Sequence, residues 1–163
     1  MMAASIHAWV EALEEAALEV VELALGLPGC AFVAKKVAAP RNVAGAYLPL
    51  FGGAGESLYV GWLVSAEASH ALAGGLLGIG AGETLADEVV ADAMGEVVNI
   101  LAGGLKRRML PLVHPLSLGL PIFSSVPIAP VHAETYACQI RSGGVDSHLV
   151  LVHAGGNGAP GSQ

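Results

Sequence analysis

Three polar residues with a helical spacing stand among apolar residues near the middle of the chain. Residues 92–104 read DAMGEVVNILAGG, and Asp92, Glu96 and Asn99 are the polar side chains of that run. The carboxylates can accept hydrogen bonds or pair with a cation, and the Asn99 amide can both donate and accept hydrogen bonds. At about 100° per residue, the three side chains fall within about 60° of one another around a helix. The spacing therefore predicts one narrow polar stripe along a helix.

The remaining residues of this segment predict which way the stripe points. The side that lies about 140° to 240° from Asp92 is apolar, and it consists of Val90, Met94, Val97, Val98, Leu101 and Leu105. We expect that side to face the core and the stripe to face outward. Gly95, Ala102 and Gly103 lie beside the stripe, although a glycine inside a helix costs about 1 kcal/mol relative to alanine. These small residues indicate a flat surface that a partner can approach closely.

An ordinary solvated helix face is the alternative interpretation of the same stripe. Asp92 and Glu96 are four residues apart, where like charges mildly destabilise a helix. Asn99 is a mediocre helix former with no evident group to cap in mid-helix. From these residues alone, a functional site and a solvated face both remain open.

The elements that must position the stripe belong to an α+β fold. Alanine- and leucine-rich periodicity predicts a helix over residues 6–25, which ends at Gly26. Ser65 is expected to cap a shorter helix, and Thr84 to open a long one that reaches about residue 110. Apolar segments bounded by turn residues predict strands at about 31–37, 43–51, 57–64, 116–126, 134–141 and 146–153. We therefore expect long helices packed on an antiparallel sheet of about six strands.

Composition supports one well-packed domain. The chain has 163 residues, of which 54% are hydrophobic and 13% charged, which argues against disorder. We expect the domain to span residues 5–153 and the Gly-, Asn- and Ser-containing tail at 155–163 to be disordered. The net charge of −7 leaves no basic surface for nucleic acid.

No membrane segment is predicted. The longest uncharged stretch runs from Met109 to Ala133, but it contains five prolines and so cannot form one continuous helix. Leu27 to Cys30 resembles a lipoprotein cleavage box, yet the segment before it is acidic where a signal peptide is basic and apolar. We expect a cytoplasmic protein.

No metal site is predicted either. Cys30 and Cys138 have no paired CxxC spacing, and reduced buried thiols are the favoured interpretation. The six histidines show no metal-binding spacing.

The polar stripe resembles a family signature when the residues after it are included. Asp92-x-x-x-Glu96-x-x-Asn99, followed by Gly103 and about twenty residues later by Pro121, is similar to the signature of the CheC/CheX/FliY chemotaxis phosphatases, which dephosphorylate the response regulator CheY. The order of the expected elements is also similar from about residue 5 to residue 153.

Within that family, the chain is most similar to the CheX branch. Members of the CheC branch usually carry a second Glu-x-x-Asn on the first helix. Here that helix offers Glu11-x-x-Glu14 and Glu19-x-x-Glu22, without an asparagine. A single site is the pattern of the CheX branch.

The resemblance implies an enzyme, a protein aspartyl-phosphate phosphatase, with Glu96 and Asn99 as catalytic residues. In the family, the asparagine orients the attacking water and the glutamate pairs with the receiver's lysine. The receiver-docking residues would then be Asp92, Gly95, Ala102 and Gly103. On the same resemblance, the chain would need no cofactor of its own, since the phosphorylated receiver would supply the magnesium ion.

The implied partners are a phosphorylated CheY-like receiver and a second copy of the chain in a homodimer. Two alternatives share the fold: a non-catalytic module that binds a receiver, and a dimeric scaffolding domain. The basic run Lys106–Arg108 is most simply complementary to the helix dipole, with attraction of an acidic receiver as the other interpretation.

Overall fold

The computed structural model describes residues 4–27, 29–38, 40, 43–53, 57–80, 83–124 and 133–154. The helices are α1 (Ile6–Glu19), its π-helical continuation η1 (Val20–Leu25), α2 (Ala66–Leu77) and α3 (Asp87–Met109). The strands are β1 (Cys30–Ala34), β2 (Ala44–Gly52), β3 (Ser57–Val64), β4 (Leu116–Leu118), β5 (Ile122–Ser124), β6 (Glu134–Ser142) and β7 (Val145–Ala154). The tail predicted to be disordered, 155–163, lies outside the described residues.

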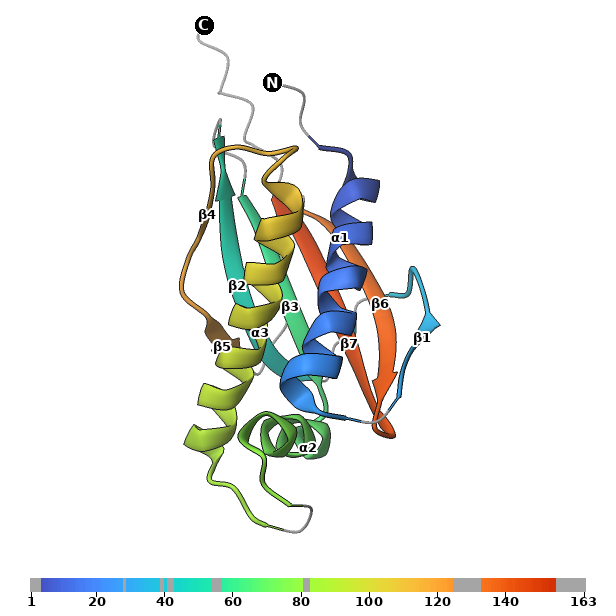
Figure 1. Cartoon of the computed structure of the whole chain (residues 1–163), viewed down its shortest axis with the longest axis vertical. Helices are drawn as coiled ribbons and strands as arrows, with labels where there is room; N and C mark the ends of the chain where they lie inside the picture. The colour runs from blue at the N-terminus through green and yellow to red at the C-terminus, as the bar shows by residue number, and fades with distance from the viewer. Residues whose placement is uncertain are drawn as a thin grey trace, which may run out of the picture.

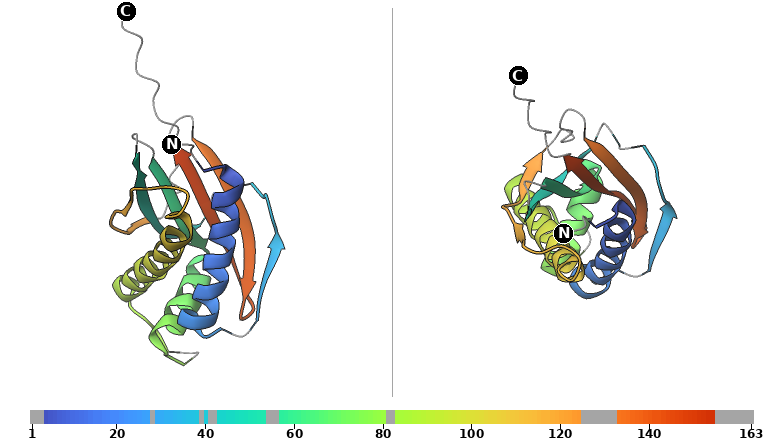
Figure 2. Two further views of the ribbon diagram at one scale, coloured as in Figure 1. Left: turned by 45° about the horizontal axis from the view of Figure 1, so that its top comes forward. Right: turned by 90° about the horizontal axis from the view of Figure 1, so that it is seen from above.

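The fold is α+β, as predicted, with one antiparallel sheet. The strand order is β1-β6-β7-β3-β2-β4, and β5 also pairs with β2. Figure 1 shows α1 and α3 side by side across one face of the sheet, with α2 across their lower ends. Seen from above in Figure 2, the sheet curves around this helix layer. The core therefore lies between the concave face of the sheet and the helices.

Local sequence signals account for most of the element boundaries. Ser5 and Ser65 cap α1 and α2 by accepting hydrogen bonds from the backbone N–H groups of Ala8 (3.2 Å) and Ala68 (3.1 Å). Gly143 and Gly144 have positive φ and join β6 to β7 in the predicted hairpin. The expected start of the third helix at Thr84 is wrong, because α3 begins at Asp87 without a side-chain cap.

The predicted strand over 116–126 is divided. β4 pairs with the end of β2, where Leu118 faces Leu50, and β5 pairs with its start, where Ile122 faces Tyr47. Between the pair Leu50–Leu118 and the pair Tyr47–Ile122, β2 has two residues. The segment opposite it, which connects β4 to β5, has three, 119–121. The extra residue makes a bulge, so the sheet has seven strands instead of about six.

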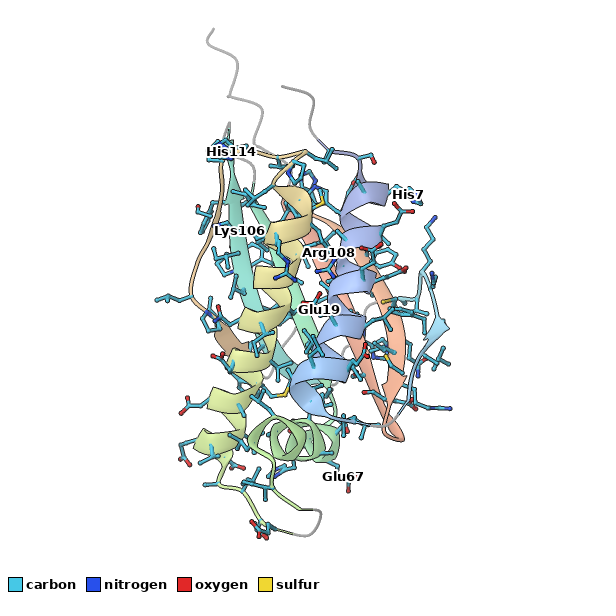
Figure 3. All side chains as sticks on the ribbon, in the orientation of Figure 1. His7, Glu19, Glu67, Lys106, Arg108 and His114 are labelled. Carbon is cyan, nitrogen blue, oxygen red and sulfur yellow. The ribbon has the colours of Figure 1, made fainter. Side chains whose placement is uncertain are left out.

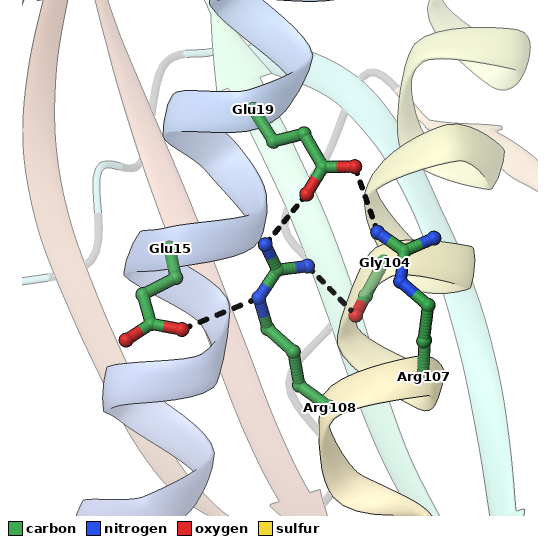
Figure 4. Close-up of polar contacts among 5 residues, drawn as sticks. All are labelled: Glu15, Glu19, Gly104, Arg107 and Arg108. Carbon is green, nitrogen blue, oxygen red and sulfur yellow. Dashed lines mark hydrogen bonds and ion pairs between the residues drawn. The ribbon is translucent and has the colours of Figure 1, made fainter.

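α1 and α3 are joined by close packing and by ion pairs. A Cβ atom at Gly104 would lie 3.3 Å from the Cβ of Ala16, so the helices meet closely there. Arg107 donates to Glu19 at 2.7 Å, and Arg108 donates to Glu19 at 2.5 Å and to Glu15 at 3.3 Å (Figure 4). These contacts give two of the three basic residues at the end of α3 a structural partner that the sequence did not reveal.

Lys106 differs from its two neighbours. Figure 3 shows Arg108 on the side of α3 that faces α1, and Lys106 on the opposite side.

In the described part of the chain, no helix has the length and apolarity required to cross a bilayer.

Candidate functional site

The polar stripe lies where the helical spacing predicts it. Asp92, Glu96 and Asn99 are exposed on α3. The six residues expected on the opposite side are all buried, with exposed fractions of 4% or less: Val90, Met94, Val97, Val98, Leu101 and Leu105. The core face therefore fixes the rotation of α3, and the stripe is presented to solvent.

The stripe lines one wall of an open groove of about 550 Å³. The other wall is the segment that connects β4 to β5 and enters β5, which Figure 1 shows beside α3. The groove is lined by Ala91, Asp92, Gly95, Glu96, Asn99, Gly119, Leu120, Pro121 and Phe123. Residues from two segments that are about 25 positions apart in the sequence thus form a single concave surface.

The second wall is held in place by the bulge between β4 and β5. The N–H of Gly119 donates to the carbonyl of Pro49 at 2.8 Å. A Cβ atom at Gly119 would lie 2.5 Å from the Cγ of Pro49, so only glycine permits this approach. Two residues later, Pro121 covers Gly95, where an added Cβ would lie 3.6 Å from the Cβ of the proline. Pro121, one of the signature residues, therefore lies against α3 where the two walls of the groove meet.

The three small residues beside the stripe have different environments. Gly103 is half-buried, and an added Cβ there would meet no atom within 4 Å. Gly95 is buried beneath Pro121 but still lines the groove. Ala102 has no exposed surface, so its expected place on a docking surface is wrong. The reason is that α3 packs against the sheet with a wider buried face than its large apolar residues alone indicate.

The functional groups of the stripe have no internal partner. Within the described residues, the side chains of Asp92, Glu96 and Asn99 make no hydrogen bond or ion pair. By contrast, the carboxylates of α1 are occupied: Glu14 accepts from Lys35 and from the Tyr136 hydroxyl, both at 3.0 Å, and Glu19 binds two arginines. The stripe on α3 is thus available for an external partner, whereas these two carboxylates of α1 are engaged in holding the fold together.

The two cysteines are protonated thiols. Burial raises the pKa of the Cys138 thiol to about 11, and burial also raises the pKa of Cys30, which keeps both thiols protonated at neutral pH. Among the described residues, no three His, Cys, Asp or Glu side chains are grouped so as to hold a metal ion.

The chain is similar to known proteins in structure but not detectably in sequence. No protein-family model matches the chain, and no curated protein sequence matches it. Solved structures do match. The chemotaxis protein CheX from Vibrio vulnificus has a TM-score of 0.70 at 16% identity, over 90% of this chain and 99% of that chain.

Two further structures extend the likeness. A chain in the CheX–CheY–BeF3–Mg²⁺ complex from Borrelia burgdorferi has a TM-score of 0.71 at 18% identity, over 88% of this chain and 96% of that chain. FliY from Thermotoga maritima has a TM-score of 0.58 at 15% identity, over 93% of this chain and 91% of that chain. The identities are low and the coverage is nearly complete, so the likeness is one of fold.

Proposed function

Because the chain has the fold of the CheC/CheX-like chemotaxis proteins, we propose that it is a phosphatase that hydrolyses the aspartyl phosphate of a CheY-like receiver. One observation carries the proposal: Glu96 and Asn99 stand exposed and without internal partners in one groove. Their spacing is the one that the resemblance assigns to the catalytic pair. A chain with this function would act in the cytoplasm, where receivers are phosphorylated.

The proposed reaction needs little more than a positioned water molecule. Water attacks phosphorus in line with the acyl oxygen, the P–O bond to the aspartyl carboxylate breaks, and inorganic phosphate leaves. The Asn99 amide oxygen accepts a hydrogen bond from that water, and its NH2 group donates to the phosphoryl oxygens. Glu96 pairs with the receiver's lysine, and the magnesium ion belongs to the receiver.

The proposed partner has independent support from a protein of the same fold. CheX from Borrelia burgdorferi was crystallised together with CheY, BeF3 and Mg²⁺. The stripe of the present chain extends over about two turns of α3, from Asp92 to Asn99, and the groove beside it is open. Both features support a protein substrate.

The direct test is to mix the chain with phosphorylated CheY-like receivers and follow the loss of phosphate. The wild type should accelerate hydrolysis. Asn99→Ala should still bind the receiver but lose about 10²-fold or more of the acceleration, by analogy with the removal of one preorganised polar group. An Asn99→Ala protein as active as the wild type would rule out the proposed role of Asn99.

The same experiment separates the enzyme from a non-catalytic receiver-binding module. A module that only binds would bind a receiver loaded with beryllofluoride and leave the lifetime of the phosphorylated receiver unchanged. A dimeric scaffolding domain would not bind the receiver, and it too would leave the lifetime of the phosphorylated receiver unchanged.

A further inference from the structure

The most exposed large apolar side chain in the described part of the molecule is Leu120, at 81%. It stands on the bulge between β4 and β5 and lines the groove opposite the polar stripe. Isolated exposed leucines are common on protein surfaces. Leu120 is unusual because the residues before and after it, Gly119 and Pro121, are both held in place by contacts.

The bulge holds Leu120 rigidly. On one side, Gly119 is bonded to Pro49 and leaves no room for a larger residue. On the other side, the ring of Pro121 rests against Gly95 of α3, and the proline also restricts the backbone of the residue before it. Because the backbone of this segment is already held, little backbone conformational entropy is lost when a partner covers Leu120.

Apolar side chains border the polar stripe on both sides. Leu120 and Phe123, the latter 41% exposed, lie on the groove side. Val89 and Ile100, at 41% and 36%, lie about 60° to 80° around α3 on the other side of Asp92. A partner that covered this surface would exclude water from around Glu96 and Asn99, which strengthens polar contacts there.

Charge decides what kind of partner fits. Asp92 and Glu96 are the charged residues of the groove, and neither has an internal cation. A second copy docked through this face would bring two further carboxylates against them, and the chain already carries a net charge of −7. A protein that presents a cation beside an apolar surface complements the groove, and the receiver of the proposed function brings a lysine.

We propose that Leu120 is a docking residue that seats the receiver against α3 and thereby places its aspartyl phosphate at Asn99. This inference rests on the phosphatase function proposed above. It assigns to the bulge between β4 and β5 the positioning of the substrate, separately from the chemistry of Glu96 and Asn99.

The test compares two exposed leucines. Leu120→Asp and Leu23→Asp place the same charge at similarly exposed positions, since Leu23 on η1 is 76% exposed and does not line the groove. The dissociation constant for a receiver loaded with beryllofluoride and Mg²⁺ is measured by calorimetry. Leu120→Asp should raise it about tenfold or more, whereas Leu23→Asp should change it by no more than about twofold.

Kinetics provide a second readout. In Leu120→Asp, the receiver concentration for half-maximal dephosphorylation should rise with the dissociation constant, and the rate at saturating receiver should stay within about twofold because the catalytic groups are unchanged. Leu120→Met should restore wild-type binding, since it conserves an apolar side chain of similar volume.

The outcomes are distinct. If the wild type neither binds nor dephosphorylates receivers, the proposed function fails and this inference fails with it. If the wild type is active and Asn99→Ala is not, but Leu120→Asp binds like the wild type, only this inference is overturned. It is equally overturned if Leu120→Asp changes the sedimentation of the chain alone and leaves receiver binding intact, because Leu120 would then join copies of the chain.

Discussion

At the scale of single residues, the site combines a local pattern with an absence of internal bonds. Glu96 and Asn99 lie three residues apart on α3, so they share a face of the helix. Neither side chain makes a hydrogen bond or ion pair with another described residue. The helix backbone fixes where the two side chains leave α3, and a partner that binds them has only their rotamer freedom to restrict.

Glu96 is expected to contribute to binding. Glu96→Ala should weaken the binding of a beryllofluoride-loaded receiver by about 10- to 100-fold, because the loss of one charge-assisted contact costs about 1.5–3 kcal/mol. Calorimetry measures the change. Glu67→Ala is the matched control, since Glu67 lies on α2, away from the groove (Figure 3), and should bind like the wild type. Equal affinities for all three proteins would contradict a role for Glu96 in docking.

At the scale of elements, the bulge and the α1–α3 contact position the site. The bulge sets the second wall of the groove, and the helix contact holds α3 against the rest of the helix layer. Each has a glycine at a point of close approach: Gly119 in the bulge, where a Cβ atom would overlap Pro49, and Gly104 in α3, where a Cβ atom would make a tight contact with Ala16.

Gly119→Ala should destabilise the protein by about 1–3 kcal/mol, because the added methyl group overlaps the ring of Pro49. Gly103→Ala makes the same chemical change in α3, where the space is open, and should be neutral or stabilising by up to about 1 kcal/mol. Urea denaturation measures both free energies of unfolding. A Gly119→Ala protein as stable as Gly103→Ala would show that the bulge does not need glycine.

The ion pairs between α1 and α3 predict a pH dependence. Hydrogen bonds from Arg108 and Arg107 hold the pKa of the Glu19 carboxyl below its ordinary value of 4.5. A carboxyl whose pKa is lowered by folding stabilises the folded state above its unfolded pKa, and this contribution is lost as the pH falls through the folded pKa. Glu19→Gln should therefore unfold at a lower temperature than the wild type at pH 7, with a difference that shrinks below about pH 4.5.

Thermal unfolding between pH 7 and pH 3 checks this expectation. Glu22→Gln is the control, because Glu22 on η1 makes no ion pair with any described residue. A difference between Glu19→Gln and the wild type that is constant over this pH range would mean that the Glu19 charge does not stabilise the fold.

At the scale of the whole molecule, the sheet leaves two edges. β1 forms one edge, and β4 with β5 forms the other. The backbone N–H and C=O groups of an edge strand can pair with another chain. Val33 on β1 is 47% exposed and Ile122 on β5 is 47% exposed, so both edges are partly apolar.

A homodimer is expected on this basis. Sedimentation at micromolar concentration should give about twice the monomer mass of 16.4 kDa. Val33→Lys should favour the monomer if β1 is the pairing edge, because a charge on an edge strand opposes pairing, and Ile122→Lys makes the same comparison for β5. A wild type that sediments only as a monomer would contradict the expectation.

The sequence by itself determined most of the elements, apart from the start of α3 and the division of β4 from β5, and the face of α3 that carries the polar stripe. These features depend on periodicity and on short-range signals: the buried side from Val90 to Leu105, the cap at Ser65 and the glycine pair at 143–144. Each is encoded within a few consecutive residues, so a pattern can reveal it. The predicted resemblance to the CheC/CheX-like proteins is confirmed at the level of the fold.

Only the tertiary structure decided what surrounds the stripe. The burial of Ala102, the cover that Pro121 places over Gly95 and the exposure of Leu120 all depend on where the segment after α3 returns along β2. The bonds from Arg108 to Glu19 join residues 89 positions apart. The physical reason is the same in each case: these contacts form between elements that meet only after the sheet and helices have packed, and no local periodicity records which surfaces then face one another.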